Sequence, residues 1–167
     1  PPGPATQPQQ SMKNLLLAAI LPGLLIAAAC EQPCSGLEDS NRGAIAGSYD
    51  FGTCFFYANS LQGEQLIRNA TEFSNFKQNF LKNCPDSGRL PAIDFSRHML
   101  IGLNTQTTAC NLAYDREISH DTAAKVYKYT VVVQRCGECG TKFRDPNWVL
   151  GPQLPAGYRF EAAVRYE

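Results

Sequence analysis

The sequence predicts an α+β fold, in which a small antiparallel β-sheet carries one main helix packed on one face and is stapled by disulfides. Three observations support this class. Apolar residues recur at helical spacing over residues 71–83, apolar and polar residues alternate in several later segments, and the 167 residues include seven cysteines. Strands that follow one another through short polar loops favour antiparallel pairing, and a helix then covers one face of the sheet.

The N-terminal residues are expected to lie outside this fold. Residues 1–11 contain four prolines and three glutamines, a composition typical of a disordered extension. In residues 12–29, Lys13 precedes an apolar run of 15 residues that ends in small side chains, which is the three-part pattern of a secretory signal. A membrane-spanning helix needs about 20 apolar residues, and Pro22 interrupts this run. We therefore interpret residues 12–29 as a signal peptide.

The end of the apolar run, IAAAC from Ile26 to Cys30, resembles the lipobox of bacterial lipoproteins. In that family small residues precede a cysteine whose thiol receives a lipid and which becomes the N-terminus. The resemblance implies that Cys30 is the site of lipid attachment. It also implies a location in the bacterial cell envelope, on the periplasmic or the surface side of the outer membrane. Acyl chains contribute about 0.8 kcal/mol per buried methylene, so two or three of them hold a soluble domain on a bilayer.

The remaining cysteines fit a disulfide framework, because lipidation of Cys30 leaves an even number in an exported chain. They are Cys34, Cys54, Cys84, Cys110, Cys136 and Cys139. Six cysteines allow fifteen pairings. Among these we favour Cys110 with Cys139, because each of the two flanks a strand of the predicted central hairpin.

The sequence CGEC, from Cys136 to Cys139, leaves two functional alternatives open. A redox dithiol sits at the start of a helix, which lowers the thiol pKa, whereas the segments that flank CGEC lack helical periodicity. A structural zinc site needs a second such pair or two histidines at fixed spacing, and the only histidines are His98 and His120. We favour a turn whose cysteines tie neighbouring strands together, with no metal and no cofactor.

Residues 30–50 are expected to form a polar tether whose only anchor is Cys34, and residues 51–167 a single domain. A short strand is predicted over residues 53–58. The main helix follows over residues 71–83.

Either Asn69 or Thr71 is predicted to cap this helix, because both side chains accept hydrogen bonds from backbone amides at helix starts. The apolar face of the helix is predicted to lie in the core, with no ligand. It consists of Phe73, Phe76, Phe80 and Leu81.

Later segments are predicted to lie in or beside the sheet: residues 98–104, 110–118, 125–134, 147–155 and 158–166. One face of the third segment carries Tyr127, Tyr129, Val131 and Val133. In the last segment the inward residues are Tyr158, Phe160, Ala162, Val164 and Tyr166, and the outward residues are Arg159, Glu161 and Arg165. Prolines interrupt residues 147–155, which predicts an edge or a loop.

Three pieces of this region carry a second resemblance: LPAIDFSRHMLIGLNT (Leu90 to Thr105), the strand KYTVVVQRCGEC, and NWVLGPQLPAGYRFEAAVRY. Their succession resembles a family of small lipoproteins and exported domains related to the C-terminal domain of PrcB, a protease-complex stability protein. In that family a helix precedes a P-x-[IV]-D-F element and a strand, and a proline-interrupted segment precedes the last strand. The resemblance covers about residues 65–167 and implies fold and location, but no catalytic residues.

The sequence favours binding over catalysis. The chain has 15 basic and 15 acidic residues, so no net field attracts nucleic acid, and it contains no serine-hydrolase, zinc-protease or phosphate-loop motif. Asp94 is predicted to cap a turn together with Ser96, and His98 and His120 to lie at the surface. The aromatic residues that a binding surface would favour are Trp148, Tyr127, Tyr158 and Tyr166. We predict a lipid-anchored module that contacts the membrane through its lipid and binds another protein.

Overall fold

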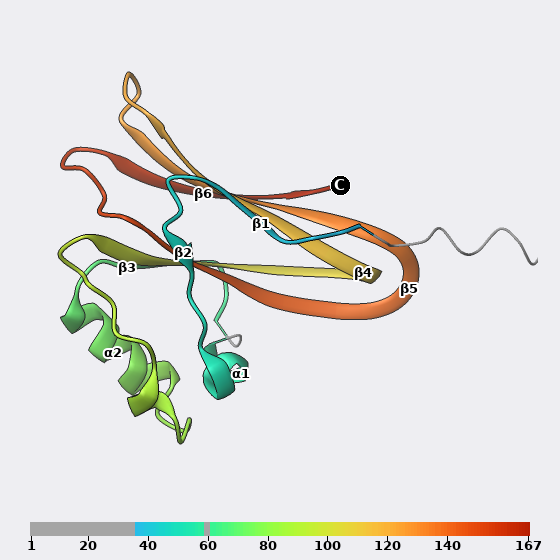
Figure 1. Cartoon of the computed structure of the whole chain (residues 1–167), viewed down its shortest axis with the longest axis horizontal. Coiled ribbons are helices and arrows are strands. Elements are labelled where there is room, and N and C mark those ends of the chain that lie inside the picture. Colours follow the sequence, from blue (N-terminus) through green and yellow to red (C-terminus); the bar gives the residue numbers. More distant parts are fainter. Residues whose placement is uncertain (1–35, 59–60) are drawn as a thin grey trace, which may run out of the picture. The chain divides into compact units, whose positions relative to one another are not determined.

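The computed structural model describes residues 36–58 and 61–167, which form a mixed six-stranded β-sheet with short helices (Figure 1). The strands are β1 (Ser40–Gly43), β2 (Gly47–Ser48), β3 (Glu64–Ile67), β4 (His98–Asp121), β5 (Val126–Pro152) and β6 (Arg159–Tyr166). The helices are α1 (Phe55–Ala58) and α2 (Ala70–Phe80), with 3-10 turns at Gly52–Cys54 and Ser87–Arg89. The predicted α+β class therefore holds in part, because strands predominate and the sheet is mixed.

One long hairpin, formed by β4 and β5, makes up most of the sheet. The two strands pair antiparallel from the open end at His98 and Pro152 to the turn at residues 122–125. The register shifts between Ala109 and Asn111. At this point the hairpin bends back on itself, at the right of Figure 1.

The bend layers the two halves of the hairpin over each other. We call residues 98–105 with 145–152 the basal half, and residues 111–121 with 126–136 the distal half. Apolar side chains of both halves share one buried cluster, which contains Met99, Ile101, Leu103, Tyr114, Ile118, Tyr127, Tyr129, Val131, Val133 and Val149. The inward face predicted from the alternation around Tyr127 is confirmed, and it packs against the other end of the same hairpin.

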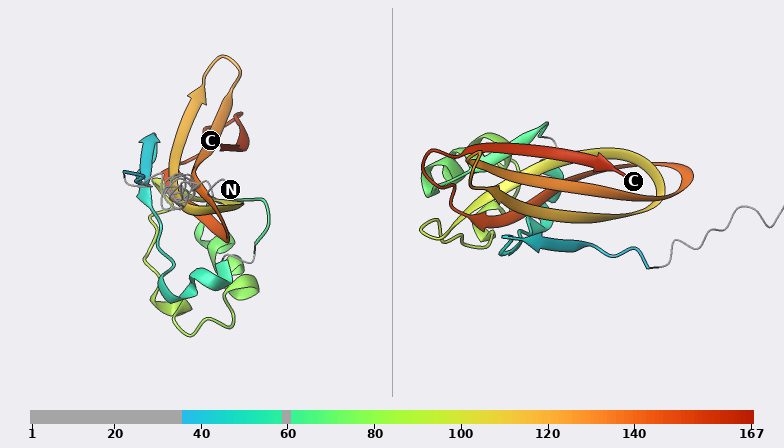
Figure 2. Two further views of the ribbon diagram at one scale, coloured as in Figure 1. Left: turned by 90° about the vertical axis from the view of Figure 1, so that its right-hand side faces the viewer. Right: turned by 90° about the horizontal axis from the view of Figure 1, so that it is seen from above.

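Each half of the hairpin carries a further strand on both sides. In the basal half, β3 pairs antiparallel with β4 and β2 pairs antiparallel with β5. In the distal half, β1 runs parallel to β4 and β6 runs parallel to β5 (Figure 2). The bend explains the parallel pairing of β6, because it brings the end of β5 back to its start: the Tyr127 hydroxyl donates to the Pro152 carbonyl at 3.1 Å. The prediction of a purely antiparallel sheet is wrong.

Helix α2 packs against the face of the basal half that points away from the distal half (Figure 1). The Asn69 side chain accepts the Glu72 backbone N–H at 2.9 Å, which confirms Asn69 as the N-cap. The helix ends at Phe80 and not at Asn83, because the chain then turns towards the disulfide at Cys84. The buried cluster between helix and sheet includes Ile67, Phe73, Phe76, Leu81, Leu100 and Trp148.

The N-terminal part of the described chain differs from expectation. The polar tether expected over residues 30–50 is wrong for β1 and β2, which pair with the hairpin, and Tyr49 is buried. The strand expected over residues 53–58 is helical instead, because the Asp50 carboxylate accepts the Gly52 N–H at 2.7 Å and starts a turn. These short strands escaped the sequence patterns because they owe their place to pairing with distant strands.

The strands of the hairpin are longer than predicted. The segments 98–104 and 110–118 belong to one strand, β4, and the segment 147–155 belongs to β5 as far as Pro152. The edge position expected for that last segment is wrong. Trp148 is buried, and its part of β5 lies between β4 and β2.

Four buried tyrosines make the stability of the domain sensitive to alkaline pH. Burial raises the pKa of Tyr49 to about 12, and it also raises the pKa of the hydroxyls of Tyr114, Tyr127 and Tyr129. The free energy of unfolding is therefore expected to fall as the pH rises above about 10, where unfolded tyrosines ionise and the buried ones stay protonated. Each tyrosine contributes a slope of about 1.4 kcal/mol per pH unit in that range.

Urea unfolding at several values between about pH 8 and about pH 11 measures this slope. The variant Tyr127→Phe removes one of the four ionising groups, so its slope is expected to be shallower by the contribution of one tyrosine. If the free energy of unfolding changed with pH equally in both proteins, ionisation of Tyr127 would not contribute to the loss of stability.

Candidate functional site

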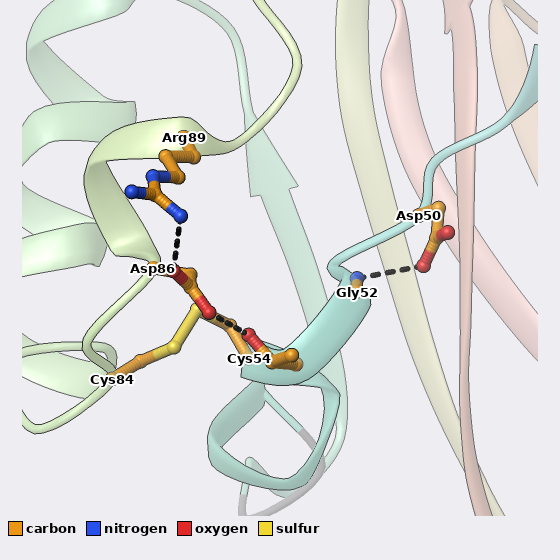
Figure 3. The surroundings of a disulfide bond; sticks show 7 residues. Asp50, Gly52, Cys54, Cys84, Asp86 and Arg89 are labelled. Atoms are coloured by element: carbon orange, nitrogen blue, oxygen red, sulfur yellow. Dashed lines mark hydrogen bonds and ion pairs between the residues drawn. A yellow bond between two sulfur atoms is a disulfide. The ribbon is translucent and has the colours of Figure 1, made fainter.

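Two disulfides join pairs of described cysteines. Cys54 and Cys84 connect the turn before α1 to the turn after α2, with Cα atoms 5.5 Å apart (Figure 3). Cys110 and Cys139 connect the two strands at the bend of the hairpin, with Cα atoms 4.7 Å apart. This second pair is the one favoured from the sequence, and both Cα distances suit a disulfide.

The two cysteines of CGEC are not bonded to each other. Cys139 is bonded to Cys110, and Cys136 is also disulfide-bonded. A redox couple of this type works by exchanging a disulfide between its own two cysteines, so this connectivity weighs against the redox alternative. The lipid-attachment candidate Cys30 and the disulfide candidate Cys34 lie outside the described residues.

A surface pocket lies next to the Cys54–Cys84 disulfide, and the polar side chains around it bond to one another (Figure 3). The Thr53 hydroxyl donates to the Asp86 carboxylate at 2.8 Å, and the Arg89 guanidinium lies 3.4 Å from the same carboxylate. Because the Asp86 carboxylate is engaged on both oxygens, we assign this pocket a local stabilising role.

A second polar cluster lies between the two halves of the hairpin. Arg116 Nε donates to Asn147 Oδ1 at 2.9 Å, and Asn147 Nδ2 donates to Thr105 Oγ1 at 3.1 Å. The Tyr114 hydroxyl donates to the Asp145 carboxylate, and burial followed by this hydrogen bond raises the pKa of Tyr114. These groups satisfy one another, as buried polar groups in a core must. The cluster therefore holds the bent hairpin together.

The remaining polar residues that the sequence singled out have ordinary structural positions. Asp94 Oδ1 accepts the backbone N–H of Ser96 at 3.0 Å, which confirms the predicted turn. Hydrogen bonds from the Ser96 hydroxyl and N–H lower the pKa of the Asp94 carboxyl. His98 opens β4 and is half-buried, and the exposed His120 stacks on Tyr127 with ring centroids 4.6 Å apart.

The aromatic residues predicted as a class for binding divide into two groups. Trp148 and Tyr127 are buried, and Tyr158 is half-buried, so core packing accounts for them. Tyr166 was expected inside but is 47% exposed. Phe80 was also expected in the core, and this is wrong, because its side chain is 42% exposed at the end of α2.

The exposed ring of Phe80 belongs to a groove between β3 and α2, which we call the β3–α2 groove. Its strand side consists of Gln65, Leu66, Ile67 and Arg68, and its helix side of Glu72, Asn75, Phe76, Asn79 and Phe80. The helix residues are spaced by three and four, so they form one continuous stripe along α2. The groove therefore follows the helix over most of its length.

The lining of the β3–α2 groove carries amides and apolar groups and no net charge. The two charged side chains pair with each other, since Arg68 Nη2 lies 2.9 Å from Glu72 Oε1. The backbone N–H of Arg68 also donates to Glu72 Oε2 at 2.7 Å. Partial burial raises the pKa of the Glu72 carboxyl, but the hydrogen bonds from Arg68 outweigh it and leave this pKa below its usual range. The groove is therefore suited to an uncharged ligand.

The sequence contained a signal for half of this groove. Asn75 and Asn79 are four residues apart and adjoin Phe76 and Phe80, which places amides and rings together on a helix. The half contributed by β3 had no comparable signal, because an open strand edge depends on which strands pair.

No family model, curated protein or solved structure matches the chain. Neither the lipobox resemblance nor the PrcB-related resemblance is tested by these comparisons, and both stay predictions. Within residues 36–58 and 61–167, no helix is long and apolar enough to cross a membrane. In the same part of the chain, no group of three or more His, Cys, Asp or Glu side chains is arranged to hold a metal ion.

Proposed function

We propose that this chain is a lipid-anchored domain of the bacterial cell envelope, which works by binding another protein and not by catalysis. Lipid at Cys30 holds the domain on the membrane, and the β3–α2 groove receives the partner. Exported domains gain stability from disulfides, and the two described disulfides are consistent with this location.

The observation that carries the proposal is the β3–α2 groove itself. An exposed aromatic ring beside hydrogen-bonding amides, with its charges paired internally, is typical of a surface that contacts another protein. Catalysis would need a free nucleophile or a free acid and base. The described cysteines are all disulfide-bonded, and Asp86, Asp94 and Glu72 are each engaged by neighbouring donors.

Photo-crosslinking in the native host tests this function. A photoreactive residue at Phe80 is expected to form an adduct with one envelope protein, and the same residue at Glu161, which is exposed on β6, is expected to form none. The variant Cys30→Ser is expected to leave the membrane fraction and to lose the Phe80 adduct. Equal adducts at both positions, no adduct at Phe80, or an unchanged membrane location of Cys30→Ser would contradict the proposal.

A further inference from the structure

The outer edge of β3 is open alongside the β3–α2 groove. Asn104 N–H donates to the Gly63 carbonyl at 3.3 Å, which makes these two residues a hydrogen-bonded pair. Bonding alternates along an antiparallel ladder, so Gln65 and Ile67 also bond to β4. The backbone N–H and C=O groups of the intervening residues, Glu64 and Leu66, then point away from β4.

Among the described residues, β3 pairs with β4 alone, and no hydrogen bond reaches the outward groups of Glu64 and Leu66. The open stretch ends at Arg68, because its N–H donates to Glu72 and its carbonyl accepts from Gln153 at 3.1 Å. A short row of donors and acceptors therefore lies next to the groove.

We propose, on the basis of the proposed function, that the partner contributes an extended, uncharged peptide segment that adds to β3 as a further strand. The segment runs between β3 and α2. Its backbone bonds to Glu64 and Leu66, and alternate side chains enter the groove. Strand addition of this kind supplies affinity through the backbone and selectivity through the side-chain positions.

The chemistry of the groove sets the occupant. Arg68 and Glu72 neutralise each other, so a charged side chain would enter without a counter-ion and lose hydration. The exposed ring of Phe80, whose centroid lies 5.5 Å from that of the buried Phe76, offers contact area to apolar side chains. The amides of Asn75 and Asn79 supply both donors and acceptors, which suits the polar backbone of an extended segment.

The other edges of the sheet differ from β3. Strand β6 presents the charged residues Arg159, Glu161 and Arg165, and β1 carries Arg42, which lies 3.5 Å from the Asp115 carboxylate. Charged side chains on an edge discourage the addition of a strand. Strand β2, the remaining edge, has only two residues, Gly47 and Ser48. The only charge on β3 is Glu64 at its start, and Gln65, Leu66 and Ile67 are uncharged, so this edge is the one that accepts a strand.

The test uses the full chain and a phage-displayed library of random linear peptides as the probe. One enriched peptide is synthesised, and hydrogen exchange of the backbone amides is followed by NMR with and without it. Exchange at Glu64 and Leu66 is expected to slow at least about tenfold on binding, because both amides gain a hydrogen bond. Exchange at Gln65 and Ile67, which bond to β4 in both states, is expected to change little.

A matched pair of variants separates the backbone from the side chain. Leu66→Pro and Leu66→Ala both remove the side chain, but only proline removes the outward N–H, and an edge strand tolerates proline at such a position. Leu66→Pro is expected to bind the peptide about five- to tenfold more weakly than Leu66→Ala, because it loses one hydrogen bond to the peptide backbone. The exchange measurement on the unaltered protein stands even where Leu66→Pro does not fold.

Several results would overturn strand addition. They are no enriched peptide, a bound peptide without slower exchange at Glu64 and Leu66, amides already protected in the free full chain, and a free domain that sediments as a dimer through β3. A Phe80 adduct in cells together with unprotected Glu64 and Leu66 would leave the proposed function standing and remove only this inference. Absence of the Phe80 adduct in cells, together with slower exchange at Glu64 and Leu66 on peptide binding, would remove the proposed function and leave strand addition to β3 standing.

Discussion

Replacing Trp148 by alanine is expected to lower the free energy of unfolding by about 3–5 kcal/mol, the usual cost of removing a buried aromatic side chain. Trp148 is 5% exposed, and its ring centroid lies 5.1 Å from that of Phe51 and 5.5 Å from that of Phe76. The indole thus joins the basal half of the sheet to α2 and to the turn before α1. Chemical denaturation followed by circular dichroism measures the loss.

Gly102 supplies the matched control for this prediction. It lies directly opposite Trp148 in the ladder, and a Cβ atom added there would be 2.5 Å from Trp148 Cζ3. Gly102→Ala alone is therefore expected to cost about 1–3 kcal/mol through overpacking. In the double variant the added methyl group occupies part of the space that the indole leaves. The double variant is therefore expected to lose less stability than the sum of the losses of the two single variants. Strictly additive losses would contradict the direct packing of Trp148 on Gly102.

Removing the Cys54–Cys84 disulfide with a double alanine variant is expected to lower the free energy of unfolding by about 2–5 kcal/mol. The two cysteines are 30 residues apart in sequence and both are buried. The bridge restricts the unfolded chain, and its sulfur atoms also fill space between α2 and the turn before α1. Urea unfolding of the oxidised parent and of the variant measures the difference.

The second disulfide provides a control with almost the same chain entropy. Cys110 and Cys139 are 29 residues apart, but they lie at the bend of the hairpin, where Cys139 is exposed. The double alanine variant of this pair is expected to lose less stability, because it leaves no buried cavity. A loss equal to or larger than that of the Cys54–Cys84 variant would show that packing around Cys54 contributes nothing.

Local sequence patterns predicted the features that depend on near neighbours in the chain. Asn69 caps α2 through a contact with a residue in the first turn, and the alternation around Tyr127 identified the buried face of a strand. The choice of Cys110 with Cys139 also succeeded, because the two cysteines lie in strands β4 and β5, which pair with each other. In each case the relevant partner lay close in sequence or within one hairpin.

The patterns failed where a contact between distant segments decided the structure. The polar residues 105–108 interrupt the apolar pattern, which suggested two strands. Backbone pairing nevertheless continues through them, since a β ladder needs no apolar side chains. Strands β1 and β2 lay inside an apparent tether for the same reason. Helical periodicity grouped Phe80 with Phe73 and Phe76, but only the last two are buried. Which rings of a helix are buried depends on the segments that pack against it, and these lie far away in the sequence.

By itself, the sequence identified the buried face of the strand around Tyr127, named Asn69 as one of two candidate caps of α2, and favoured the disulfide at the bend among the possible pairs. The lipid-anchored exported protein that it indicates stays a prediction. The tertiary structure alone decided that the hairpin folds back on itself, that the sheet is mixed, and that β3 keeps an open edge beside α2. The physical reason is that periodicity records which side of a local element is buried. Strand pairing and the exposure of an edge depend instead on hydrogen bonds between residues far apart in the chain.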